Sequence, residues 1–166
     1  MDDLLQIYKP NEQYNLKETF SKIYDKALKI EQTNITNDES NFLDLTLMIN
    51  RESNSIVSKL YNKTDDYNFK IRRYPHFTSN IPTSIGLNTI KGEIIRFSRC
   101  CSEVNYFLER VEAIIKDFEF NKFPTQVIYN RCIRVLQSNT HILNKYPKKE
   151  IYTFINHKKS LIMNHK

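Results

Sequence analysis

The sequence predicts an α+β protein, with a small antiparallel sheet and one helix in its first part and a helical bundle in the rest. Alternating apolar residues at 42–49 and 55–61, separated by the polar run NRESN, predict two strands joined by a hairpin loop. From residue 84 onward, apolar residues recur at helical spacing. Only two glycines and five prolines are present, which argues against the many tight turns of a sandwich or barrel.

Bulk composition narrows the class of protein. A chain of 166 residues is the size of one domain, and 40% apolar content with 12% aromatic content excludes a disordered chain. There is no 18-residue apolar run that would predict a membrane span, and the acidic start MDD lacks the basic region of a signal peptide. The three cysteines show no CxxC spacing, so we expect free, buried thiols. We therefore expect a soluble intracellular protein.

Charge is distributed unevenly along the chain. Residues 1–68 hold 8 Lys+Arg and 12 Asp+Glu, a balance of −4, whereas residues 69–166 hold 17 and 7, a balance of +10. A basic half of this kind indicates a polyanionic partner, either nucleic acid or an acidic membrane surface. The alternative is that the lysines only solvate helices.

The first 61 residues read as a partial sheet with one helix. Asn15 is predicted as an N-cap with Glu18 three residues later, and the helix that follows has one apolar face made of Leu16, Phe20, Ile23 and Tyr24. Residues 27–35 alternate as a strand would. The run FLDLTLMI, residues 42–49, is the strongest predicted strand, and one of its faces is almost purely aliphatic: Leu43, Leu45, Leu47 and Ile49.

Residues 62–83 form a predicted extended strap. Pro75 and Pro82 disfavour a helix there. Aromatic and basic side chains interleave along it: Tyr67, Phe69, Tyr74, His76 and Phe77 with Lys63, Lys70, Arg72 and Arg73. This pattern is typical of nucleic-acid surfaces, which use stacking and phosphate contacts. A second interpretation, in which the aromatic side chains fix the strap to the sheet, remains open.

Residues 84–166 are predicted to be a helical bundle. Ser84 is the expected N-cap of a helix to about Cys101, whose outer face carries Gly92, Arg96 and Arg99; this face is either a phosphate-binding surface or ordinary solvated surface. Ser102 is the expected cap of a second helix to about residue 119, and two more helices are expected after Pro124 and Pro147. Their inward residues follow the helical period; Arg131 and Arg134 lie outside the apolar stripe of the third helix: Ile128, Cys132, Val135 and Leu136.

Sequence motifs of common active sites are missing: there is no Gly-rich phosphate loop, HExxH or metal-spaced Cys/His cluster. However, the order of MDDLL, FLDLTLMI, KLYNKTDDYNF, YPHFTSNIPTS, EIIRFSRCCS and YFLER resembles the C-terminal part of reverse transcriptases of animal-type retroelements, including the Penelope-like group. The resemblance runs from residue 1 to about 137. It implies the end of a palm at 1–61, a connecting strap at 62–83 and a helical thumb at 84–166.

This resemblance also implies roles for particular residues. Asp2 and Asp3 stand at the catalytic aspartate pair, which in the complete enzyme would hold Mg²⁺ for nucleotidyl transfer. The thumb would grip a primer–template duplex of RNA or DNA. The expected phosphate contacts are Lys70, Arg72, Arg73, Arg96 and Arg99, and Tyr74 and His76 are expected to stack on bases or to support the strap.

We expect the purified 166-residue chain to show no polymerase activity, because the aromatic residue before the Asp pair, the fingers and much of the palm are not in it. The missing polymerase half would then be a partner. Two alternatives are a stand-alone nucleic-acid-binding module and a protein-interaction module that binds an acidic partner. Primer-extension assays test the expectation, and any extension by the purified chain would contradict it.

Overall fold

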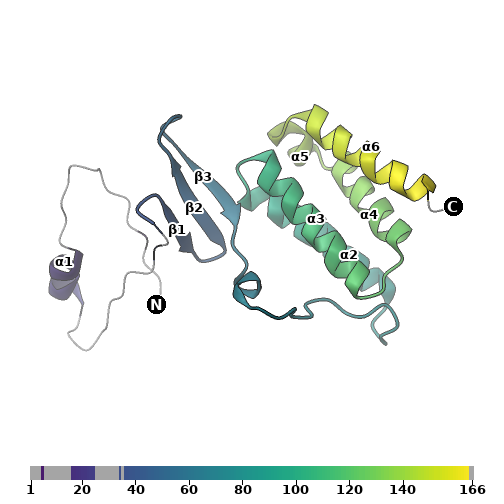
Figure 1. Cartoon of the computed structure of the whole chain (residues 1–166), viewed down its shortest axis with the longest axis horizontal. Coiled ribbons are helices and arrows are strands. Elements are labelled where there is room, and N and C mark those ends of the chain that lie inside the picture. Colours follow the sequence, from purple (N-terminus) through teal and green to yellow (C-terminus); the bar gives the residue numbers. More distant parts are fainter. Residues whose placement is uncertain (1–4, 6–15, 25–33, 35, 165–166) are drawn as a thin grey trace.

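The structure is a computed structural model, and it describes residues 5, 16–24, 34 and 36–164 (Figure 1). A three-stranded sheet lies at one end of a helical bundle, as the α+β prediction requires. The elements are α1 (Leu16–Ile23), β1 (Glu39–Phe42), β2 (Leu45–Asn50), β3 (Ser55–Leu60), a 3-10 turn (Lys63–Asp66), α2 (Thr83–Cys100), α3 (Val104–Phe120), α4 (Thr125–Ser138), α5 (Thr140–Lys145) and α6 (Lys148–Asn164).

The N-terminal predictions are only partly covered by the described residues. The helix expected after Asn15 is confirmed as α1. Asp2 and Asp3 lie outside the described residues, as does nearly all of the strand expected at 27–35. The structure therefore neither supports nor contradicts these two predictions.

The sheet is antiparallel throughout, in the order β1-β2-β3. The predicted hairpin between β2 and β3 is confirmed, and the side chain of Asn50 stabilises its loop by accepting hydrogen bonds from the backbone N–H of Glu52 and Ser53. The prediction of a single strand at 42–49 is wrong. A tight turn at Leu43, which has a φ of 54°, divides this run into the end of β1 and most of β2.

The sheet meets the bundle along β3, through hydrogen bonds that involve the backbone and the hydroxyls of two serines. Ser102 was predicted to cap α3, but the cap position is Glu103. Ser102 instead binds the edge of β3: its N–H donates to Ser58 O at 2.9 Å, and its Oγ accepts from Ser58 N at 3.0 Å. Ser58 Oγ donates to Cys100 O at 2.8 Å. These bonds fix the loop between α2 and α3 against the sheet.

The core of the bundle lies between α2, α3 and α4, and α6 packs against α4 (Figure 1). Residues predicted to face inward are fully buried in each of these helices, for example Ile94, Phe107, Phe118, Ile128 and Ile155. α2 begins at Thr83 after Pro82, so Ser84 is not its cap. The short helix α5 was not predicted. It is capped by Asn139, whose side chain accepts from Ile142 N at 3.3 Å.

The expectation of free, buried thiols is confirmed for two of the three cysteines. Cys100, Cys101 and Cys132 are free thiols, and the last two are buried. Burial raises the pKa of the Cys132 thiol to about 12. None of the helices among the described residues is both long and apolar enough to cross a lipid bilayer.

The two glycines of α2 predict opposite effects of the same substitution. A Cβ on Gly86 would lie 2.9 Å from Cζ of Phe123, whereas a Cβ on Gly92 would meet nothing within 4 Å. Alanine gains helix propensity at both sites, about 0.5–1 kcal/mol. We expect Gly92→Ala to raise the free energy of unfolding by about that amount. We expect the free energy of unfolding of Gly86→Ala to be about 1–3 kcal/mol lower than that of Gly92→Ala. The added Cβ would press on Phe123, which is packed between Phe77 and Phe118.

Urea unfolding followed by circular dichroism measures both changes, and each variant serves as the control for the other. Equal stability of the two variants would contradict the tight approach at Gly86.

Candidate nucleic-acid interface

The turn between α3 and α4 sets the position of α4. Asn121 lies in the turn and is buried; its backbone N–H bonds back to Asp117 O, and its carbonyl accepts from Phe77 N at 2.9 Å. Lys122 adopts a left-handed conformation with a φ of 66°, which turns the chain. Phe123 then enters the core, and Pro124 directly precedes the first residue of α4. A short turn fixed on both sides therefore holds α3 and α4 in one orientation.

The outward face of α4 is polar and carries no negative charge. Its exposed residues are Gln126, Val127, Asn130, Arg134, Gln137 and Ser138. At 100° per residue, they span about 120° of the helix. Neither α4 nor its flanks contain an acid: residues 120–149 hold six Lys+Arg and no Asp or Glu. This segment is the longest part of the described chain that presents only neutral and positive side chains.

α2 extends this face on one side. Arg131 of α4 joins the two helices, since its Nε donates to Leu87 O at 3.0 Å and its Nη2 to Asn88 Oδ1 at 2.6 Å. Beyond Asn88, the outward stripe of α2 continues through Lys91, Gly92 and Arg99, which are all exposed. We call the outward stripes of the two helices the α2–α4 surface: Asn88, Lys91, Gly92, Arg99, Gln126, Asn130, Arg131, Arg134 and Gln137.

Of the two arginines predicted on α2, only Arg99 is exposed. Arg96 turns toward the sheet, where its Nη2 lies 2.8 Å from Asp44 Oδ2 and its Nη1 lies 3.3 Å from Glu93 Oε2. These two carboxylates already compensate its charge. Arg96 thus links α2 to the turn between β1 and β2, and a phosphate would have to compete with both carboxylates for it.

The basic residues predicted in the strap lie near the end of α3. Lys70 Nζ lies 4.1 Å from the ring centroid of Phe120 and 3.4 Å from Asp117 Oδ1. The Arg72 guanidinium lies 5.6 Å from the same ring. The Arg73 guanidinium lies 5.5 Å from the Tyr74 ring. All three side chains belong to exposed residues, so the strap presents a compact cationic surface.

Tyr74 and His76 support the strap. Tyr74 is buried and stacks on Phe118 with ring centroids 4.8 Å apart, which leaves no face for a base. Burial raises the pKa of Tyr74 to about 12. His76 is half-buried, and its Nδ1 lies 2.9 Å from Thr78 Oγ1. The exposed aromatic side chains of the strap are instead Tyr67, Phe69 and Phe77.

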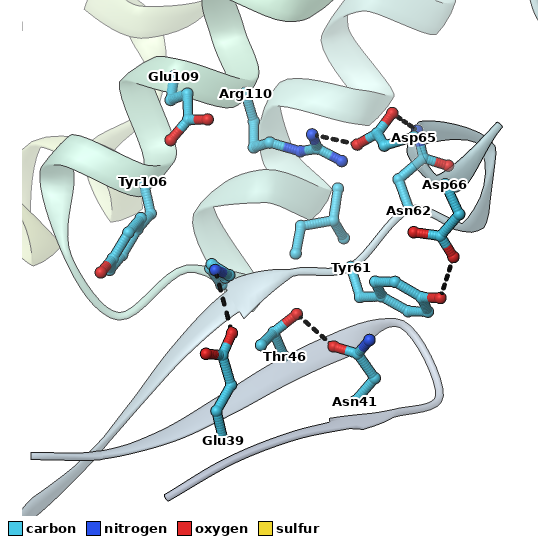
Figure 2. A pocket seen from close by; sticks show the side chains of 12 residues that line it. Glu39, Asn41, Thr46, Tyr61, Asn62, Asp65, Asp66, Tyr106, Glu109 and Arg110 are labelled. Atoms are coloured by element: carbon cyan, nitrogen blue, oxygen red, sulfur yellow. Dashed lines mark hydrogen bonds and ion pairs between the residues drawn. The ribbon is translucent and has the colours of Figure 1, made fainter. Parts of the chain in front are cut away.

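A pocket of about 320 Å³ lies between the sheet and α3 (Figure 2). Three of the four carboxylates that line it are paired within the pocket: Glu39 with Lys59 at 3.4 Å, Asp65 with Arg110 at 2.8 Å, and Asp66 with the hydroxyl of Tyr61. The bond to Asp66 raises the pKa of Tyr61, because it stabilises the neutral phenol. The acidic lining disfavours a phosphate, so we assign this pocket to the sheet–helix junction rather than to nucleic acid.

Among the residues that the structure describes, no group of three or more His, Cys, Asp and Glu side chains could hold a metal ion. The Mg²⁺ site implied by the resemblance would depend on Asp2 and Asp3, which are outside those residues. No catalytic step can be derived from the described part of the chain.

The geometry of α2, α3 and α4 agrees with a comparison to known families. Residues 73–134 match the family model of the animal helix-turn-helix domain. The match starts in the strap and includes α2, α3 and most of α4. No curated protein and no solved structure matches the chain. The helix-turn-helix is a nucleic-acid-binding fold, so the nucleic-acid part of the expectation from sequence is supported, and the reverse transcriptase part stays a prediction.

Sequence reasoning identified the strap and α2 as candidate sites but gave α4 no role. The sequence signal that points to α4 is the run of 30 residues without an acid, which is conspicuous in a chain with 27% charged residues. The position of Arg131 and Arg134 outside the apolar stripe shows only that these side chains are not part of the core. An apolar stripe identifies the buried side of a helix, and charge is needed to assign the exposed side.

Proposed function

We propose that the chain binds a DNA duplex through the α2–α4 surface, with α4 directed into the major groove. The observation that carries this proposal is the outward face of α4, which combines Gln126, Asn130, Arg134 and Gln137 with a complete lack of acids. Arginine pairs with guanine, and Asn and Gln pair with adenine, in the major groove of DNA. In helix-turn-helix proteins, the second helix of the motif occupies this groove.

α2 would then contact the phosphate backbone. Lys91 and Arg99 supply positive charge beside α4, and the open space over Gly92 allows a sugar–phosphate chain to approach the helix closely. Phosphate contacts fix the position of a protein on a duplex, while base contacts set the sequence preference. In this proposal, α2 positions the protein on the duplex and α4 sets the sequence preference.

The specific duplex we propose is a primer–template held by the thumb of a reverse transcriptase. The sequence resemblance carries this finer proposal, and the junction between sheet and bundle agrees with it. Because β3 is bonded directly to the loop between α2 and α3, the bundle is fixed relative to the sheet. A stand-alone nucleic-acid-binding module would have the same α2–α4 surface. The two candidate functions differ in the duplex that they prefer. A thumb should bind a recessed-end duplex more tightly than a blunt one, whereas a stand-alone module should bind both equally well.

Salt-dependent binding tests the proposal. The chain is titrated into fluorescein-labelled blunt and recessed-end duplexes, and anisotropy is measured at several salt concentrations. Lys91→Ala and Arg99→Ala are each expected to lower the slope of log K against log salt by about 0.9. Lys159→Ala on α6 is the matched control, since that exposed charge lies outside the α2–α4 surface.

Slopes equal to that of the unsubstituted chain for both variants would contradict the phosphate role of α2. Arg96→Ala separates the two possible roles of that residue. If Arg96 contacts a phosphate, the substitution lowers the slope of log K against log salt. If Arg96 serves only in the ion pairs with Asp44 and Glu93, the slope stays unchanged. Binding of an acidic polypeptide in preference to any duplex would favour a protein-interaction module instead.

A further inference from the structure

We propose that the strap between the sheet and the helix-turn-helix segment is a separate binding site for single-stranded nucleic acid. In this site, Tyr67 and Phe69 stack on bases, and Arg72 and Arg73 contact phosphates. The site goes beyond the duplex binding proposed for the α2–α4 surface and does not depend on it.

The two aromatic rings are unusually open to solvent. Tyr67 is 55% exposed and Phe69 is 65% exposed, although side chains of this size are normally largely buried. Their ring centroids lie 5.5 Å apart with an interplanar angle of 43°. A base between two rings needs about 7 Å, twice an ordinary carbon–carbon contact distance. A base therefore does not fit between them, and each exposed ring would take a base on its outward face.

The segment that carries Tyr67 and Phe69 is fixed at both ends, which restricts the positions of the two exposed rings. At the start, Asn62 caps the 3-10 turn by accepting from Thr64 N at 3.3 Å. At the end, Tyr74 is buried against Phe118, and Phe77 N donates to Asn121 O. A surface ordered before binding loses less conformational entropy when a ligand binds.

The charge around the rings is suited to a polyanion. Residues 67–73 contain three Lys+Arg and no acid. All of them except Arg72 line a hollow of about 350 Å³ that also includes Asp65 and Asp117. Asp65 is paired with Arg110 at 2.8 Å, and Asp117 with Lys70 at 3.4 Å. Because both carboxylates are already compensated, Arg72 and Arg73 remain available for phosphates.

The chemistry selects a single strand rather than a duplex. Bases in a duplex stack on one another and offer only their edges in the grooves, whereas unpaired bases offer free faces. Aromatic faces beside arginine and lysine are the usual means of binding single strands without sequence preference. A strap site of this kind would hold an unpaired strand.

A tryptophan probe tests stacking directly, because the chain contains no natural tryptophan. In the variant Phe69→Trp, the only indole stands at the proposed site, and its emission is expected to be quenched when a 12-nucleotide oligo(dT) is added. Tyr152→Trp on α6, where the natural side chain is 43% exposed, is the matched control and should show no quenching. An unquenched indole at position 69 under conditions of saturating binding would overturn the proposal.

Binding measurements separate this site from the α2–α4 surface. Tyr67→Leu and Phe69→Leu keep an apolar side chain but remove the ring, and each is expected to weaken binding of labelled oligo(dT) about tenfold, with Tyr152→Leu as control. Binding of a blunt duplex should be unchanged in both variants. Arg134→Ala should show the reverse pattern, so that a failure of duplex binding is distinguishable from a failure of the strap site. Unchanged oligo(dT) binding, or equal losses for single strand and duplex, would overturn the proposal.

Discussion

Replacing Glu112 by Gln is expected to lower the free energy of unfolding by about 3 kcal/mol, because the ammonium group of Lys158 then stays buried without a counter-charge. Lys158 of α6 is only 3% exposed, and its Nζ lies 2.5 Å from Glu112 Oε2 of α3. The same Nζ lies 5.2 Å from the ring centroids of Tyr129 and Phe154. One side chain thus connects α6 to both α3 and α4.

Lys158 and Glu112 differ in burial, so removing either one should have a different effect on stability. Glu112 keeps a side-chain exposure of 35%, so it can turn to water when Lys158 is removed. We therefore expect Lys158→Met, which keeps the aliphatic contacts of the stem, to cost about 1 kcal/mol. The double variant should recover much of the stability lost in Glu112→Gln. Urea unfolding of the three variants measures this cycle.

Matched controls come from neighbouring exposed positions. Glu109→Gln on α3 and Lys159→Met on α6 make the same chemical changes at exposed residues and should change stability by less than about 0.5 kcal/mol. If Glu112→Gln behaves like Glu109→Gln, the buried pair contributes nothing, and α6 is held by apolar contacts alone.

The helices were predictable from sequence because their cores depend on local periodicity. Val104, Phe107, Val111, Ile115 and Phe118 repeat at helical spacing, and all of them are buried in α3. Helix caps were less predictable. Ser84 and Ser102 have the right residue type, but Ser102 finds a stronger role in bonding to β3. A sequence pattern does not show which distant backbone groups will compete for a hydroxyl.

The error in the sheet has a similar physical origin. Alternation in FLDLTLMI is compatible with one long strand, but the structure turns at Leu43, which is 63% exposed. The turn places Asp44 where Arg96 can reach it, at 2.8 Å. A long-range ion pair of this kind leaves no trace in local periodicity. The predicted aliphatic face is likewise not the core, since Ile49 is 42% exposed while Thr46 on the other face is buried.

The strap shows how far residue types can define a site. The sequence predicts an aromatic and basic segment and leaves two roles open for its aromatic side chains. The aromatic side chains divide by position: Tyr74 packs on Phe118 of α3, not on the sheet, while Tyr67 and Phe69 face solvent. The segment lacks a regular period, so the sequence alone could not assign the roles.

The most informative variants for the proposed groove contact are Asn130→Ala with Arg134→Ala, and Arg134→Lys. Because one bidentate base contact discriminates by about 1–3 kcal/mol, loss of two is expected to weaken binding to a preferred duplex by at least about 30-fold. Arg134→Lys keeps the charge but loses the planar fork, so it should keep the salt slope while relaxing the sequence preference. Selection from a random duplex pool, followed by anisotropy on the selected duplex, measures both properties. A sequence preference that survives in Arg134→Lys would remove Arg134 from base recognition.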